Sequence, residues 1–73
     1  MFIAKSENYR ANTRQAATLT ARPAILITPE EGREPAILLR SSGQIHGVLP
    51  LGEGMRLATE IADIIAAQRE AQQ

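Results

Sequence analysis

A short apolar segment opened by proline occurs twice in the chain, at a spacing of twelve residues. Residues 23–27 read Pro-Ala-Ile-Leu-Ile, and residues 35–39 read Pro-Ala-Ile-Leu-Leu. Continuous apolar runs of this length are typical of strands that are covered on both faces, whereas alternating runs are typical of strands covered on one. The repeat therefore predicts two strands of one sheet, with apolar side chains on both sides.

The first strand is predicted over residues 18–28, where threonine and aliphatic side chains alternate. Pro23 has no N–H group, so this strand is predicted to lie at a sheet edge or to carry a bulge. The next residues, Thr28-Pro29-Glu30-Glu31-Gly32, begin like a helix, but Gly32 and Pro35 allow no more than one turn. They predict a loop in which Gly32 takes a left-handed conformation.

Two further strands are predicted over residues 36–40 and 44–49, joined by the turn Ser41-Ser42-Gly43. A three-residue turn with Gly43 in a left-handed conformation pairs Leu39 with Ile45 and Ile37 with Gly47. This register divides the side chains of the two strands between the two faces of the sheet. One face carries Ile37, Leu39, Ile45 and Leu49. The other face carries Ala36, Leu38, His46 and Val48.

The C-terminal segment has the spacing of an amphipathic helix, predicted over about residues 53–69, with residues 71–73 frayed. Its polar side chains lie opposite an apolar stripe. The stripe consists of Leu57, Ala58, Ile61, Ile64 and Ile65. Residues 1–16 show no clear period and predict a basic, weakly ordered segment in front of one β-β-β-α domain over residues 17–73.

The predicted fold class is α+β: a three-stranded antiparallel β-meander followed by one C-terminal α-helix packed on one sheet face. The helix is expected to cover Ile25, Ile27, Ile37 and Leu39. The other face then keeps an uncovered apolar patch, which predicts an interface. Two copies stacked as a sandwich or joined at their sheet edges would form a two-fold homodimer; the alternative is residues 1–16 folding back with Phe2, Ile3 and Tyr9 as the cover. The candidate dimer interface is Ala24, Leu26, Ala36, Leu38, His46 and Val48.

Composition supports an assembly. A chain of 73 residues is close to the lower limit for a self-sufficient core, and such chains usually need disulfides, a metal or oligomerisation. There is no cysteine and one histidine, so disulfides and histidine-rich metal sites are excluded. No apolar run has the length of a membrane span or a signal peptide, and a cytoplasmic location is predicted. The composition is typical of small bacterial or phage accessory proteins.

Candidate chemistry is sparse. His46 has no obvious nucleophile or orienting acid nearby in the sequence, and Gly52-Glu53-Gly54 before the helix matches no phosphate-binding loop. The acidic residues of the loop and of the helix are expected to be solvated, with Arg56 paired to Glu60. We therefore expect no catalytic residue, no cofactor and no metal. The sequence predicts a non-enzymatic module that forms a homodimer and binds another macromolecule, with a protein as the expected partner.

The charge distribution suggests an alternative function. Residues 1–22 carry four basic side chains against one acidic, a net charge of +3, while residues 23–73 carry four basic against seven acidic, a net charge of −3. A basic leader is suited to an acidic partner such as nucleic acid. The candidate contacts are Lys5, Arg10, Arg14 and Arg22. The sequence does not match the ribbon-helix-helix DNA-binding proteins, because their strand is followed by two helices and only one helix is predicted here.

Overall fold

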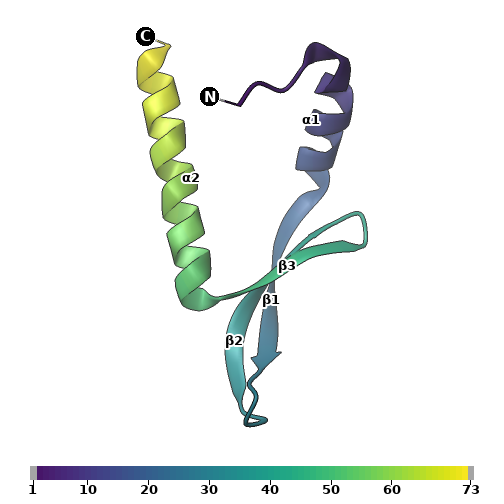
Figure 1. Ribbon diagram of the computed structural model, residues 1–73, viewed down its shortest axis with the longest axis vertical. Coiled ribbons are helices and arrows are strands. Elements are labelled where there is room, and N and C mark those ends of the chain that lie inside the picture. Colours follow the sequence, from purple (N-terminus) through teal and green to yellow (C-terminus); the bar gives the residue numbers. More distant parts are fainter. Residues whose placement is uncertain (1, 73) are drawn as a thin grey trace.

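The computed structural model describes residues 2–72 and contains a three-stranded antiparallel sheet followed by a long C-terminal helix (Figure 1). The elements in chain order are the 3₁₀ turn η1 (Ser6–Asn8), α1 (Tyr9–Thr18), β1 (Leu19–Ile27), β2 (Arg33–Ser41), β3 (Gln44–Pro50) and α2 (Leu51–Ala71). The strand order in the sheet is β1-β2-β3. The predicted α+β class, the meander and the C-terminal helix are thus confirmed. Met1 and Gln73, the ends of the two predicted units, lie outside the described residues.

The N-terminal part of the chain forms a helix that the sequence analysis did not predict. Residues 9–18 are helical, and α1 continues directly into β1 without a loop. No side chain of α1 is buried. The helix is joined to the sheet at its last residue, where Thr18 and Ser41 form a hydrogen bond of 2.7 Å between their hydroxyl oxygens.

The turn between β2 and β3 has two residues, so the predicted three-residue turn is wrong. Ser41 pairs with Gln44, and the intervening Ser42 and Gly43 have φ values of 50° and 82°. Two positive φ angles define a type I′ turn, whose twist matches that of the flanking strands.

Beyond the Arg40–Ile45 pair the register of β2 and β3 shifts, which changes the side of the sheet on which residues of β3 lie. Leu39 pairs with Gly47 and Ile37 with Leu49, where the sequence analysis paired Leu39 with Ile45 and Ile37 with Gly47. Because one extra residue is accommodated in β3, His46 lies beside Leu19 and Leu39. It is therefore not on the face of Leu38 and Val48, where it was predicted.

The loop between β1 and β2 also differs from the prediction. The residue with a positive φ is Glu31, at 63°, and not Gly32. Thr28 closes the loop, because its N–H donates to the Gly32 carbonyl and its hydroxyl accepts from the Gly32 N–H, both at 2.9 Å. A Cβ atom at position 32 would lie 3.1 Å from the Thr28 hydroxyl, so Gly32 provides close approach instead of a left-handed backbone.

The molecule is extended. Both helices point toward one end of it, and the β1–β2 hairpin points toward the other (Figure 1). The principal dimensions are 49 × 27 × 18 Å, and the Cα radius of gyration is 15.7 Å. A compact domain of this length has a radius of gyration of about 11 Å. The chain therefore lacks the compactness of a domain that packs on itself.

Candidate interaction surface

The described residues form almost no hydrophobic core. Ala36 is the one apolar residue among them that is buried, and none of their large side chains is fully buried. The chain exposes 6539 Å², whereas a compact monomer of its mass exposes about 4,400 Å². A chain with 44% hydrophobic residues thus leaves most of them in contact with solvent.

The sheet has two sides, which the strand pairing defines. Cross-strand partners share a side, so the side that faces α2 is called the helix side and the other the open side. On the helix side lie Ala21, Pro23, Ile25, Ile27, Pro35, Ile37, Leu39 and Leu49. On the open side lie Arg22, Ala24, Leu26, Ala36, Leu38, Arg40 and Val48.

Helix α2 covers only one end of the helix side. The residues of its first three turns, from Gly54 to Ile61, lie over Ile37, Leu39 and Leu49 around a hollow of about 260 Å³. From the sequence, the same helix is expected to cover Ile25 and Ile27 as well. That expectation is wrong, because α2 runs away from the β1–β2 hairpin (Figure 1).

The hairpin end of the helix side is consequently uncovered. Ile25 and Ile27 are 55% and 61% exposed, and Pro23 and Pro35 are exposed beside them. An apolar hollow of about 570 Å³ lies where this area meets the start of α2, between Ile25, Ile37 and Leu51. We call Pro23, Ile25, Ile27 and Pro35 the hairpin surface.

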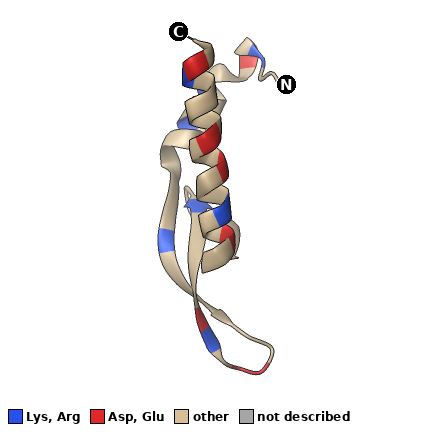
Figure 2. Ribbon diagram, turned by 90° about the vertical axis from the view of Figure 1, so that its left-hand side faces the viewer, with Lys and Arg blue, Asp and Glu red and all other residues tan. Residues whose placement is uncertain are grey.

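The far half of α2 is uncovered too. Every described residue from Ala58 onward is exposed, and Ile61, Ile64 and Ile65 are 50%, 59% and 47% exposed. We call these three isoleucines the helix stripe. Five of the charged residues of α2 share its outer side, away from the sheet (Figure 2). They are Glu53, Arg56, Glu60, Asp63 and Glu70, whereas the helical spacing puts Arg69 near Ile65. The side that carries the helix stripe has no described residue packed against its second half.

The candidate dimer residues predicted from the sequence are only partly together. Ala24, Leu26, Leu38 and Val48 share the open side with the buried Ala36, but His46 does not. Ala24, Leu26 and Leu38 are half-buried within the chain, so they expose less apolar area than the hairpin surface. The hairpin surface could not be predicted from the sequence, because the helix was expected to lie along the whole row, whereas α2 runs away from the hairpin (Figure 1).

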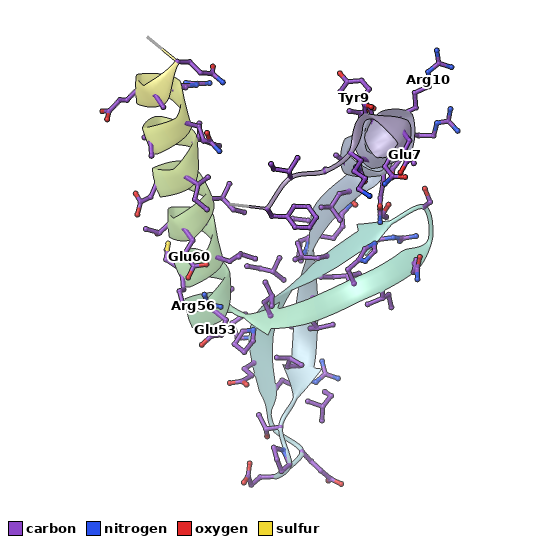
Figure 3. The ribbon with its side chains drawn as sticks, turned by 45° about the horizontal axis from the view of Figure 1, so that its top comes forward. Glu7, Tyr9, Arg10, Glu53, Arg56 and Glu60 are labelled. Atoms are coloured by element: carbon purple, nitrogen blue, oxygen red, sulfur yellow. The ribbon has the colours of Figure 1, made fainter. Side chains whose placement is uncertain are left out.

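The basic residues of the N-terminal part project into solvent. Tyr9 and Arg10 point away from the sheet at the start of α1 (Figure 3), and Arg14 follows one turn later. Within residues 2–72 the ion pairs all involve Arg56. Lys5, Arg10, Arg14 and Arg22 therefore have no acidic partner in the described part of the chain.

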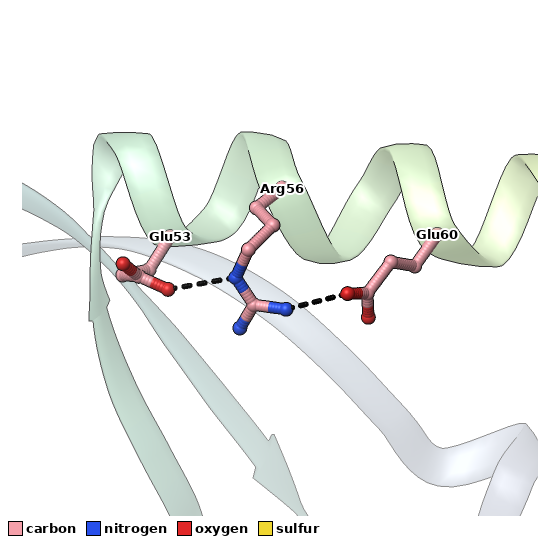
Figure 4. Close-up of polar contacts among 3 residues, drawn as sticks. All are labelled: Glu53, Arg56 and Glu60. Carbon is pink, nitrogen blue, oxygen red and sulfur yellow. Dashed lines mark hydrogen bonds and ion pairs between the residues drawn. The ribbon is translucent and has the colours of Figure 1, made fainter.

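Arg56 lies between two carboxylates on the outer side of α2 (Figure 4). Its Nε donates to Glu53 at 2.9 Å and its Nη1 donates to Glu60 at 2.7 Å. The hydrogen bond to Glu53, then that to Glu60, and the two negative charges raise the pKa of Arg56. The predicted Arg56–Glu60 pair is confirmed, and Glu53 joins it.

The described residues can also be compared with the requirements of a metal site and of a membrane-spanning helix. Among residues 2–72 no three side chains of the metal-binding types lie close enough together to hold an ion. No helix in the part of the chain that the structure describes combines the length and the apolarity needed to cross a membrane. No protein-family model, curated protein or solved structure matches this chain significantly.

Proposed function

We propose that this chain is a small non-enzymatic interaction module whose working form is a homodimer. The observation that carries the proposal is the absence of a fully buried large side chain among the described residues. Folding is driven by removing apolar area from water, and a single copy leaves its isoleucines exposed. A second copy supplies the missing cover without requiring any other component.

The size of the uncovered area supports the same proposal. The chain exposes about 2,000 Å² more than a compact monomer of equal mass. A stable interface of standard size buries about 1,600 Å² in total, or about 800 Å² on each partner. The excess area is therefore sufficient for one complete interface on each copy, with surface remaining for a further partner.

The test is the mass of the protein in solution over a dilution series. Light scattering after size exclusion, or native mass spectrometry, is expected to give twice the 7.9 kDa chain mass at micromolar concentration. The midpoint of urea unfolding is expected to rise with protein concentration, because dimerisation stabilises by mass action. A folded monomer with a concentration-independent midpoint would contradict the proposal.

A second candidate function is nucleic-acid binding through the N-terminal basic residues. The favouring observation is that Lys5, Arg10, Arg14 and Arg22 have no ion-pair partner within residues 2–72. Dimerisation would double this set, and phosphate contacts of this kind weaken steeply as salt is added. The expected result is salt-dependent binding of a labelled duplex that is lost in the Arg10→Ala/Arg14→Ala variant.

The matched control for this test is Arg33→Ala/Arg69→Ala, which removes the same charge outside the N-terminal part. A protein that uses α1 retains binding in the control. Equal loss in both variants would indicate a nonspecific charge effect, and no binding at low salt would exclude this second function.

A further inference from the structure

The two uncovered apolar surfaces lie at opposite ends of the molecule. The hairpin surface continues the row of helix-side residues that begins with Leu39 and Ile37. The helix stripe belongs to α2, which covers the start of that row and then extends beyond the sheet (Figure 1). The helix stripe faces the level of the sheet and the hairpin surface faces the level of the helix, but they lie at opposite ends, so neither can reach the other within one chain.

The uncovered part of α2 is long enough to span the hairpin surface. The helical segment from Ile61 to Ala71 spans about 15 Å at the 1.5 Å rise of an α-helix, and the helix stripe occupies about the first 6 Å of it. The strand segment from Pro23 to Ile27 spans about 13 Å at about 3.3 Å per residue. A helix and a two-stranded ribbon, each with one apolar side, are the layers that pack together in α+β proteins.

We propose that two copies pair about a two-fold axis across the long dimension, so that the helix stripe of each copy covers the hairpin surface of the other. This inference rests on the proposed homodimer and specifies its interface. A two-fold contact is reciprocal: if Ile64 of one copy lies against Ile25 of the second, Ile64 of the second lies against Ile25 of the first. One axis therefore covers both surfaces on both copies.

The other two-fold arrangements leave apolar surface exposed. Pairing α2 with its counterpart covers the helix stripe but leaves Ile25 and Ile27 in water. Stacking the open sides covers Leu38 and Val48 but leaves both the hairpin surface and the helix stripe uncovered. The reciprocal arrangement covers exposed isoleucines of both elements, which are Ile25 and Ile27 of the sheet and the three isoleucines of the helix stripe.

Single cysteines test the arrangement, since the natural chain contains none. Ile25→Cys and Ile64→Cys are purified separately, one of them isotope-labelled, mixed and oxidised. The expected main product is the mixed disulfide between positions 25 and 64. The matched control pairs Ile64→Cys with Leu26→Cys, which differs by one position and lies on the open side, and is expected to give little mixed product.

The other outcomes overturn the inference in distinguishable ways. A dimer that links 64 to 64, or 26 to 26 in the open-side variant, retains the homodimer but excludes the reciprocal interface. A monomeric mass excludes both. A second measurement compares the dimer dissociation constants of two variants. Ile27→Asp is expected to raise this constant about tenfold or more, whereas Val48→Asp on the open side is expected to leave it unchanged. A larger effect of Val48→Asp than of Ile27→Asp would also overturn the inference.

Discussion

Gly54 in the first turn of α2 lies so close to Ile37 of β2 that a Cβ atom at position 54 would overlap with Cδ1 of Ile37. The absence of a side chain at position 54 lets the helix approach the sheet where the two elements first meet. Glycine inside a helix costs about 1 kcal/mol relative to alanine. The sequence thus gives up helix propensity in exchange for helix–sheet contact at this position.

The first prediction concerns the coupling between these two residues. Gly54→Ala gains helix propensity but must displace Cδ1 of Ile37, so its net effect on the free energy of unfolding is expected to be small or destabilising. In an Ile37→Val background that Cδ1 atom is gone, and the same change is expected to stabilise by up to about 1 kcal/mol. Urea unfolding of the four variants at one protein concentration measures the difference; equal effects in both backgrounds would show that the two residues do not interact.

A second prediction concerns the attachment of α1 to the sheet. Thr18 donates its hydroxyl hydrogen to the Gln15 carbonyl at 2.9 Å, so Ser41 is the donor in the Ser41–Thr18 bond of 2.7 Å. Ser41 is 5% exposed, and Ser41→Ala is expected to destabilise by about 1 kcal/mol. Amide exchange in residues 9–18 is expected to accelerate, because this contact fixes the end of α1.

The control for this prediction is Thr18→Val, which removes the acceptor and keeps the shape. If the hydrogen bond is the cause, the double variant Ser41→Ala/Thr18→Val is destabilised by less than the sum of the two single variants. Additive effects would assign the loss to packing of the individual side chains.

The elements of the sheet could be predicted from sequence because each has a clear local signal. The prolines and apolar runs at 23–27 and 35–39 locate β1 and β2, and the isoleucine spacing after Leu57 locates α2. Helix α1 has no such signal: its apolar residues are Tyr9 and alanines, and none of its side chains is buried. Its helical state is favoured by the intrinsic propensity of alanine, arginine and glutamine, which a search for periodicity does not detect.

The errors in the candidate surface have a tertiary origin. A two-residue turn at Ser42-Gly43 and a register shift beyond it determine the side of His46, and periodicity alone cannot distinguish this from a longer turn. The direction in which α2 leaves Pro50 determines whether it covers Ile25 or runs away from it. Where α2 leaves the sheet, Gly54 lies in close contact with Ile37, and this contact is not visible in the sequence pattern.

A third prediction concerns Glu31, which has a φ of 63° in the loop between β1 and β2. A left-handed conformation costs a residue with a Cβ atom about 1–2 kcal/mol, and glycine avoids that cost. Because glycine also loses more backbone freedom on folding, Glu31→Gly is expected to stabilise by about 0.5–1 kcal/mol. The matched control is Glu30→Gly, which removes the same charge at a neighbouring position without a positive φ and is expected to give no gain.

A fourth prediction follows from the arrangement of Glu53, Arg56 and Glu60. The pKa of Arg56 is raised in the folded state. The stabilisation that the charged Arg56 side chain provides is therefore fully present below the ordinary pKa of arginine. It is lost only as the pH rises through the higher pKa of the folded state. Because these side chains are more than half exposed, solvent and salt screen the pairs strongly. Arg56→Gln is expected to leave the unfolding midpoint at neutral pH close to that of Arg69→Gln, and a much larger loss for Arg56 would contradict this.

The last prediction is that the helical state of the second half of α2 depends on the proposed assembly. Residues 62–71 have no buried or half-buried side chain, and isolated helices shorter than about 12–15 residues are marginal in water. In a dissociated chain this segment is therefore expected to fray, whereas a partner seated on Ile64 and Ile65 would hold it. Amide exchange at residues 62–71 is expected to slow as protein concentration rises through the dimer dissociation constant, while exchange in the central strand β2 changes less. Fast exchange at 62–71 at every concentration, in a sample shown to be dimeric, would place the dimer contact away from the helix stripe.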